Sequence, residues 1–478
     1  MVTLSFAGGL GPGGRGRRRG RLVGEHGQSC LLRSVAQRVA HQHPDPRRHR
    51  IHLGGRRSPV PQEGQDRRSA LWIPGLPLRP AGRGSWLRDR CPDAGGTALT
   101  ATVAGEDIAA RRSEIREFLT DSPRPEGLRN YGPTPTPDDV GPGRLWHKHL
   151  AAHGYTCLHW PTEYGGADAS VAFQAVFAEE CARAGVPRQL GITAVDLVGP
   201  VLIAYGSEEQ KRTYLEPIRL GDHVWTQLFS EPGAGSDLAG VRTKAEPVDG
   251  GWKINGQKVW SSAANSAQYG LLLARTEADS HRGLSMFVVP MDAPGVTVRP
   301  LRQIDGECKF NEVFLDDVLL GPDAIVGEPG QGWAIALLTL GRERLTLGSQ
   351  AVSMFKLLEL MSAAAAQRDR LDAVTKRSLI KLWTRMWLLR YTWQRAVAGG
   401  DLTAPAFSVL KLMTSETDRD LGDMATDVLG TDACATPESS ELIRAMLVGR
   451  AQTILGGTSE IQRNILAERL LGLPKDRR

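Results

Sequence analysis

The fold is decided by the stretch Trp252-Lys253-Ile254-Asn255-Gly256-Gln257-Lys258-Val259-Trp260, where a chain of mostly helical pattern changes to a strand pattern. Branched and aromatic residues on both sides of its centre favour extended backbone. Asn-Gly is the residue pair most typical of a tight hairpin turn. We therefore predict two short strands around an Asn255-Gly256 turn.

Further strands are predicted on the C-terminal side of this stretch. Gly, Pro and Asp separate short runs of branched and aromatic residues, as they do between the strands of a compact sheet. The runs are Tyr269–Arg275, Leu284–Pro290, Val296–Leu301 and Glu312–Leu315. Together with the first stretch they predict an antiparallel barrel or sandwich of about a hundred residues, the usual size of such a unit.

The segment before the sheet has apolar residues at helical spacing. Helices are predicted over Glu106–Leu119, Leu145–Ala152, Ser170–Ala184 and Ala194–Tyr205. Ser207 then caps a further helix, because a serine hydroxyl can accept a hydrogen bond from a free amide in the first turn. This segment is predicted to form an N-terminal helical domain.

The segment after the sheet is helical again. Long periodic runs predict helices over 331–364, 369–399, 405–430 and 439–453, and a last helix begins near Thr458. The fold class is therefore α+β with several domains, ending in a four-helix bundle. The predicted boundaries are 1–100 for an extension, 101–222 for the N-terminal helices, 223–330 for the β domain and 331–478 for the bundle.

Residues 1–98 are a different kind of sequence. They contain 18 Arg, no Lys and six acidic residues, a net charge of +12, so the remainder of the chain carries −6. Gly and Pro interrupt every apolar run, and no amphipathic face can be drawn. Such a segment buries too little apolar surface to offset its ordering entropy. We predict an Arg/Gly/Pro-rich, disordered extension.

Three explanations for this extension are open. Clustered Arg attracts phosphate, which suits a nucleic-acid-binding tail. An Arg-rich, acid-poor start also suits a transit peptide, although its length and its Gly and Pro content do not. The third explanation, which we favour, is a translation start assigned too far upstream. We expect no nucleic-acid partner for the mildly acidic body of the chain.

The cysteine spacing and the lengths of the apolar runs exclude several classes of protein. The six cysteines form no CxxC pair, so neither a zinc site nor a disulfide framework is expected. No apolar run is long enough to span a membrane. We expect free thiols, no metal and a cytoplasmic location.

Four local motifs carry the chemistry. They are Ser207–Lys211, Phe229-Ser230-Glu231-Pro232-Gly233-Ala234-Gly235-Ser236-Asp237, Asn255–Ser262 and Gly457-Thr458-Ser459-Glu460-Ile461-Gln462-Arg463. These motifs, in this order and with this succession of helices, sheet and helices, resemble the acyl-CoA dehydrogenase family over roughly residues 104–474. The resemblance implies an FAD flavoprotein of lipid metabolism and β-oxidation, which removes two hydrogens from the α and β carbons of an acyl-CoA thioester.

The resemblance assigns cofactor contacts to the sheet. Gln227, Phe229 and Ser230 would line the flavin ring, with Ser230 bonding near its reactive nitrogen. Trp260 and Ser262 would pack against the other side of the ring and contact the ribityl region. Taken singly, Phe229 and Trp260 are as well explained as core aromatics. The four motifs together favour the flavin interpretation.

Other contacts are implied outside the strands. Ser236 lies where the family contacts the thioester arm of CoA, so it is a candidate for both cofactor and substrate binding. The Gly233-Ala234-Gly235 run would let backbone approach the ligands closely. Thr458 and Glu460 would face the flavin from the C-terminal motif.

The catalytic base departs from the commoner family pattern. Many members carry a Glu directly before the Gly-Thr of the C-terminal motif, and this chain has Gly456 there. A branch resembling isovaleryl- and long-chain acyl-CoA dehydrogenases carries the base on an earlier helix, in a Glu-Arg-Leu pattern. Glu343-Arg344-Leu345 matches it. We therefore expect Glu343 to take the α-proton.

The substrate contacts follow from this choice. The candidates for substrate binding are Arg344, Gly456, Gly457 and Ser236. Gly456 has no side chain, so it leaves room for a carboxylate from the other helix. The competing interpretation makes Glu343 a solvated helix carboxylate, since such residues are usually surface charge. Glu460 is the reserve candidate for the base, about one helical turn beyond the usual position.

Assembly and electron acceptor are open. The family suggests a homotetramer and an electron-transfer flavoprotein as acceptor, but Leu429–Asp432 replaces the usual Gly-Gly-Asn-Gly turn, and no Arg-x-x-Phe segment is evident near 366–380. One alternative is a base-lacking partner subunit of a heteromeric dehydrogenase. Another is an acyl-CoA oxidase-like flavoenzyme. Straight-chain, branched and sterol side-chain CoA esters all remain possible substrates.

Overall fold

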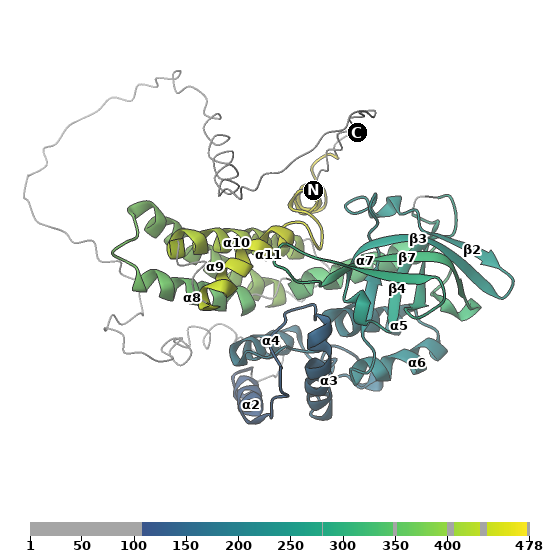
Figure 1. The fold of residues 1–478 in the computed structure, drawn as a ribbon, viewed down its shortest axis with the longest axis horizontal. Coiled ribbons are helices and arrows are strands. Elements are labelled where there is room, and N and C mark those ends of the chain that lie inside the picture. The colour runs from purple at the N-terminus through teal and green to yellow at the C-terminus, as the bar shows by residue number, and fades with distance from the viewer. Residues whose placement is uncertain (1–107, 280, 348–350, 399–405, 431–436, 476–478) are drawn as a thin grey trace, which may run out of the picture. The chain divides into compact units, whose positions relative to one another are not determined.

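The computed structural model describes residues 108–475 except 280, 348–350, 399–405 and 431–436. All of them belong to one compact unit of the chain, Pro77–Arg478. The predicted disordered extension, residues 1–100, lies outside the described residues. Figure 1 shows helices first, then a sheet, then a second group of helices. The predicted α+β class and this order of elements are confirmed.

The first group of helices lies before the sheet in the chain. It comprises α2 (Ile108–Asp121), α3 (Pro137–Ala152), α4 (Val171–Ala184), α5 (Gly199–Tyr205) and α6 (Glu208–Arg219), with the short helical turns η1 (Thr162–Tyr164) and η2 (Thr193–Val198) between them. Helices α2, α3 and α4 share one apolar core, in which Trp146 and Phe177 are fully buried. Buried apolar residues of α5, α6 and η2 belong to a second cluster, which includes the sheet. Ser207 caps α6 as predicted, since its hydroxyl accepts a hydrogen bond from the Gln210 amide at 3.2 Å.

Two helices differ from prediction. The first, α3, begins at Pro137, eight residues before the predicted start at Leu145. Proline is well tolerated at the first helical position, where its missing N–H has no partner in any case. Asp139 completes the start by accepting from the Thr136 amide at 2.8 Å. The predicted helix Ala194–Tyr205 is divided into a π-helical turn, η2, followed by α5.

The β domain is one eight-stranded sheet within the described residues. Its order is β6-β7-β3-β2-β4-β5-β8, with β1 paired to β4. The strands are β1 (Trp225–Leu228), β2 (Lys244–Val248), β3 (Gly251–Ser262), β4 (Tyr269–Arg275), β5 (Leu284–Pro290), β6 (Val296–Leu301), β7 (Phe310–Leu320) and β8 (Ile325–Val326). Most pairs are antiparallel, but β4 pairs in parallel with β1 and β2.

The predicted turn at Asn255-Gly256 is wrong. β3 runs unbroken through both residues, with an irregular register at Gly256. The sheet overrides the local turn preference because β3 has a partner strand on each edge, β2 and β7. A side chain at Gly256 would clash with Oγ1 of Thr243 on the approaching chain, so the glycine serves close packing. The real hairpin turn is Asp249-Gly250, between β2 and β3.

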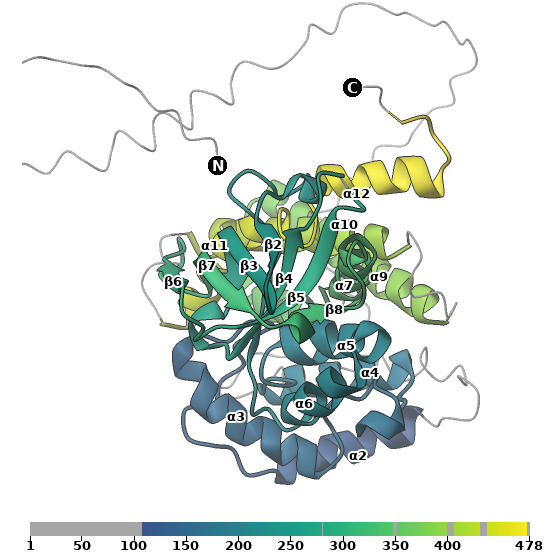
Figure 2. The same cartoon turned by 90° about the vertical axis from the view of Figure 1, so that its right-hand side faces the viewer.

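The last helices also differ in one respect. Residues 331–364, predicted as one helix, contain α7 (Gly332–Leu347) and α8 (Ala351–Ala366). α9 (Ala373–Ala398), α10 (Ala406–Leu429) and α11 (Pro437–Gln452) follow, then α12 (Ser459–Ile465) and the π-helical turn η7 (Leu466–Leu470). Helices α8 to α11 share one buried apolar cluster, whereas α7 packs on the sheet and η2. Figure 2 shows α12 beside α10.

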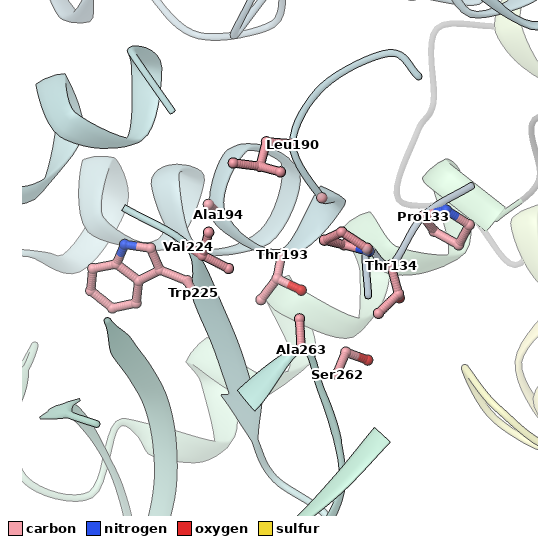
Figure 3. A pocket seen from close by; sticks show the side chains of 11 residues that line it. Pro133, Thr134, Leu190, Thr193, Ala194, Val224, Trp225, Ser262 and Ala263 are labelled. Atoms are coloured by element: carbon pink, nitrogen blue, oxygen red, sulfur yellow. The ribbon is translucent and has the colours of Figure 1, made fainter. Parts of the chain in front are cut away.

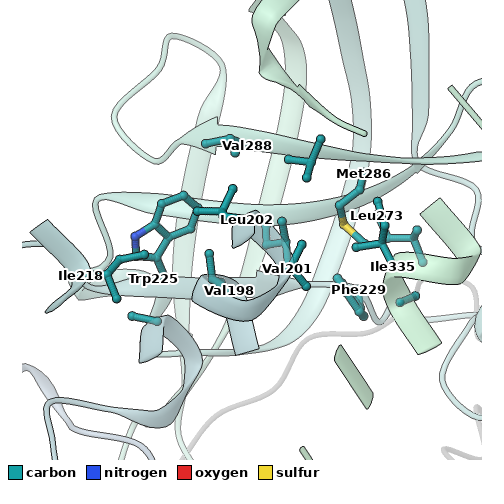
Figure 4. Close-up of a cluster of buried hydrophobic side chains, with 14 of the residues drawn as sticks. Val198, Val201, Leu202, Ile218, Trp225, Phe229, Leu273, Met286, Val288 and Ile335 are labelled. Carbon is teal, nitrogen blue, oxygen red and sulfur yellow. The ribbon is translucent and has the colours of Figure 1, made fainter. Parts of the chain in front are cut away.

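A second apolar cluster ties α7 to the rest of the molecule. Figure 4 shows Ile335 of α7 lying near Phe229, Leu273 and Met286 from the sheet, with Val198 of η2 in the same cluster. Helix α7 therefore helps to connect the three parts of the molecule, since it contacts β5 of the sheet, η2 of the N-terminal helices and α10 of the bundle.

The described residues contain no helix long and apolar enough to cross a membrane.

Candidate active site

The loop after β1 forms a tight, exposed turn. The Glu231 amide donates to the Ala234 carbonyl at 2.9 Å, and the Ala234 amide donates back to the Glu231 carbonyl at 3.1 Å. Gly233, Gly235 and Ser236 lie exposed on this turn. A Cβ atom at either glycine would meet no other atom within 4 Å. Internal packing therefore does not require glycine here, and the small residues leave the surface open for a ligand.

The start of this loop lies against the end of β3. The Val259 amide donates to the Ser230 carbonyl at 2.9 Å. The bond brings Ser230 next to Trp260, although the two residues are 30 positions apart in the chain. The hydroxyls of Ser230 and Ser262 form no hydrogen bond with any described residue, so both are free to bond to a ligand. Three of the predicted cofactor residues are thus gathered at one end of the sheet.

Trp260 is held in an unusual conformation. Its φ is +61°, in the left-handed region that residues with a side chain rarely adopt, and its side chain is 60% exposed. The register of β3 against β7 shifts between Lys258 and Ser261, which produces this bend. Such a conformation costs about 1–3 kcal/mol and is typical of functional sites. An exposed, rigidly held aromatic beside free hydroxyls fits a planar ring such as a flavin.

A buried ion pair supports this region. Lys258 has no exposed surface, and its ammonium lies 2.8 Å from Oε1 of Glu231. Glu231 also accepts from the amides of Arg242 at 2.7 Å and Thr243 at 2.8 Å. Burial lowers the pKa of Lys258 to about 8, although Glu231 opposes that change. Burial raises the pKa of Glu231. The Lys258 ammonium and the hydrogen-bond donors around the carboxylate lower this pKa by a larger amount, so it lies below its ordinary value.

Sequence reasoning gave Glu231 and Lys258 no role. Both lie within the motifs that carry the resemblance, in Phe229–Asp237 and Asn255–Ser262. No local pattern marks either residue as buried, because their burial depends on contacts between the loop after β1, β3 and β4.

A narrow pocket lies beside this site. Figure 3 shows Ala263, which follows β3, lying next to Thr193 of η2. The lining residues are Pro133, Thr134, Pro135, Leu190, Gly191, Thr193, Ala194, Val224, Trp225, Ser262 and Ala263. Ser262 is the predicted cofactor residue in this group. The pocket therefore joins the end of β3 to the N-terminal helices.

Glu343, the predicted base, lies near the end of α7 with a partly buried side chain. The charge of its neighbour Arg342 interacts with that of Asp196 in η2. Burial lowers the pKa of Arg342, and Asp196 of η2 opposes that change. Asp196 also forms an ion pair with Arg188. The side chain of Arg344 lies outside the described side chains.

The C-terminal motif is positioned by the bundle. Lys411 of α10 donates to the Gly457 carbonyl at 2.6 Å. Thr458 caps α12, with its hydroxyl accepting from the Ile461 amide at 3.2 Å. Glu460 is exposed, and its carboxylate lies 3.9 Å from Arg463. The positions of Thr458 and Glu460 therefore depend on α10. The positions of Ser230 and Trp260 depend on the sheet.

Three family models match the chain. They are described as the N-terminal, middle and C-terminal domains of acyl-CoA dehydrogenase, and they match residues 105–222, 226–318 and 330–471. The chain belongs to the acyl-CoA dehydrogenase family. It is an oxidoreductase of the acyl-CoA dehydrogenase type with FAD as its cofactor.

The relatives agree with this family. The chain is 42% identical over 389 residues to the acyl-CoA dehydrogenase IpdE1 of Mycobacterium tuberculosis, a match that covers 78% of this chain and 99% of that protein. It resembles the ChsE4-ChsE5 complex of the same organism, with 28% identity, a TM-score of 0.69 and coverage of 78% and 100%. It also resembles the Tcur3481-Tcur3483 steroid ACAD, with 28% identity, a TM-score of 0.68 and coverage of 77% and 98%.

Proposed function

We propose that this protein desaturates an acyl-CoA thioester between its α and β carbons, with Glu343 as the base and the end of β3 as the flavin site. The observation that supports this most directly is the grouping of Trp260, Ser230 and Ser262 at one end of the sheet. Bound FAD supplies the acceptor for the hydride that leaves the β carbon. The protein residues hold the ring, bind the thioester and remove the α-proton.

The flavin ring is assigned to the sheet residues. Trp260 provides an aromatic surface, and the hydroxyls of Ser230 and Ser262 provide hydrogen bonds at the polar edge. Gln227 lies on β1 and Phe229 directly after it, where the backbone of both residues can face the same ring. Thr458 and Glu460 contribute from the C-terminal motif.

Removal of the substrate's α-proton is assigned to Glu343. Removal of a weakly acidic α-proton requires a carboxylate in a dry site and hydrogen bonds to the thioester oxygen. Glu343 lies on α7, whose core residue Ile335 shares an apolar cluster with Phe229 of the flavin segment. Gly456 has no side chain that could compete for this role. Ser236, Arg344 and Gly457 are the proposed contacts to the rest of the substrate.

The assembly is proposed to include a second chain. Two of the similar structures, ChsE4-ChsE5 and Tcur3481-Tcur3483, are named as pairs of chains. Helix α9 carries the exposed apolar side chains Ile380, Leu388 and Tyr391, which lie at helical spacing. A related subunit or a second copy of this chain is proposed to cover them. Because the similar Tcur3481-Tcur3483 protein is a steroid ACAD, polycyclic CoA esters are the first substrates to test.

The test is anaerobic bleaching of the flavin by a panel of acyl-CoAs, with wild type compared with Glu343→Gln. Bleaching in the wild type that the variant loses supports both the reaction and the base. Equal bleaching in both proteins keeps the reaction and removes Glu343 from it, and Glu460→Gln is then compared in the same way. A colourless purified protein that takes up no FAD contradicts the proposed site.

Electron transfer is tested separately. An electron-transfer flavoprotein is the proposed acceptor. Sustained peroxide formation in air, at the rate of substrate consumption, would instead assign the chain to the oxidase type.

A further inference from the structure

The side chain of Lys258 has no exposed surface. It donates to the Phe229 carbonyl at 3.0 Å, to the Leu273 carbonyl at 2.8 Å and to Oε1 of Glu231 at 2.8 Å. An ammonium has three N–H groups, so all of them are used. Two of these partners, Phe229 and Glu231, lie in the loop after β1, and the third, Leu273, lies on β4. One side chain of β3 therefore joins two separate segments to its own strand.

Stability alone does not explain this arrangement. Withdrawing two charges from water costs several kcal/mol per ion in general, and well-packed apolar side chains often stabilise a protein as much or more. What an apolar pair cannot do is orient two carbonyl groups. The Phe229 carbonyl is one of the two that Lys258 orients, and Phe229 precedes Ser230. The ion pair thus fixes backbone direction at the start of the flavin segment.

The same residue also fixes the other side of the site. Lys258 lies two positions before Trp260, at the point where the register of β3 shifts. The Val259 amide between them donates to the Ser230 carbonyl at 2.9 Å. The bonds from Lys258 to Phe229 and from Val259 to Ser230 thus join consecutive residues of β3 to consecutive residues of the loop, and they hold the loop against the bend of β3.

We propose that Lys258 and Glu231 are positioning residues, which set the spacing between Ser230 and Trp260 so that both reach the flavin ring. This inference rests on the proposed assignment of Ser230 and Trp260 to flavin binding. Neither charged group touches the cofactor in this proposal. Their effect passes through the Phe229 carbonyl and the bend at Trp260.

The experiment compares Lys258→Met with Lys253→Met. Lys253 lies on the same strand, but its ammonium is partly exposed and 3.7 Å from Asp317. For each apoprotein we would measure circular dichroism, the dissociation constant of FAD for the folded fraction, and the visible spectrum of the bound flavin. We expect Lys258→Met to weaken FAD binding about tenfold or more, the loss typical when a group that orients a ligand contact is removed. Lys253→Met should leave both values unchanged.

A second variant keeps the test decisive if Lys258→Met does not fold. Lys258→Met leaves the Glu231 carboxylate buried and unpaired, which can unfold the domain. The double variant Glu231→Gln with Lys258→Met removes both charges. In a positioning role it should fold and still bind FAD weakly with an altered spectrum. If either folded variant binds FAD with the wild-type dissociation constant and spectrum, the proposal is overturned.

The same titration separates this inference from the proposed site. Trp260→Ala tests the flavin assignment itself. If Trp260→Ala binds FAD normally while Lys258→Met does not, the site assignment fails and the positioning proposal falls with it. If Trp260→Ala weakens binding and Lys258→Met does not, the site stands and only the positioning proposal fails.

Discussion

At the scale of single residues, Trp260 is the clearest test of the site. Trp260→Ala removes an exposed side chain, so the free energy of unfolding should not fall. Loss of its stacking surface should weaken FAD binding by about 1.4 kcal/mol or more, which is a factor of about ten in the dissociation constant. Fluorescence titration of the apoprotein with FAD measures this change. Leu319→Ala, at an exposed position of β7, is the control that should bind FAD normally.

The glycines of the site and of the sheet should respond in opposite ways. A Cβ atom at Gly235 meets nothing within 4 Å, so Gly235→Ala should fold normally and weaken ligand binding. A Cβ atom at Gly256 would clash with Thr243, so Gly256→Ala should destabilise the fold by about 1–3 kcal/mol, the usual cost of overpacking. Thermal unfolding and FAD or CoA titration measure the two effects. Ligand binding by Gly235→Ala at the wild-type affinity would contradict the open-surface interpretation.

At the scale of elements, an ion pair joins α2 to α4. Arg112 of α2 donates to buried Glu180 of α4 at 2.7 Å, and Arg116 donates at 3.1 Å. Burial raises the pKa of Glu180, but the hydrogen bonds from Arg116 and Arg112 outweigh this and lower it below 4.5. Glu180→Gln should cost about 2 kcal/mol at pH 7, the typical loss for hydrogen bonds to a charged group.

The pH dependence of this pair has a definite sign. The pKa of Glu180 is lower in the folded state, so its stabilisation is fully present above the unfolded value near pH 4.5 and is lost as the pH falls through the folded value. Thermal unfolding of wild type and Glu180→Gln between pH 7 and pH 3 measures the difference. The two curves should converge in acid, and a constant difference would contradict the assignment.

Several elements could be predicted from local sequence. The structure reproduces Tyr269–Arg275, Leu284–Pro290 and Val296–Leu301 to the residue. The connections between these strands contain Asp, Gly and Pro, which disfavour extended backbone, so the local signals were sufficient. Asn255-Gly256 failed for the opposite reason, since a two-sided sheet outweighed a good turn sequence. The division of 331–364 into α7 and α8 was missed, although Gly348, a residue typical of helix ends, directly follows the last residue of α7.

At the scale of the whole molecule, the exposed side chains of α9 should control assembly. Leu388→Glu with Tyr391→Asp places charges on the proposed contact surface, and a buried unpaired charge is unfavourable. We expect a smaller species in multi-angle light scattering, with the helical circular dichroism retained. Leu319→Glu on β7 should leave the mass unchanged. An unaltered mass for the α9 variant would exclude this face from the interface.

The sequence by itself determined the family, the order of helices and sheet, and the residues that face the flavin in the proposal, because motifs and periodicity are local properties of a chain. The domain boundaries and the roles of Glu343 and the other site residues stay predictions. Only the tertiary structure decided which of these residues meet. Ser230 lies beside Trp260 because the Val259 amide of β3 bonds to the Ser230 carbonyl in the loop after β1, and Lys258 is buried because its side chain reaches the carbonyls of Phe229 and Leu273. Contacts between distant segments depend on how the sheet closes over its core, and no local pattern contains that information.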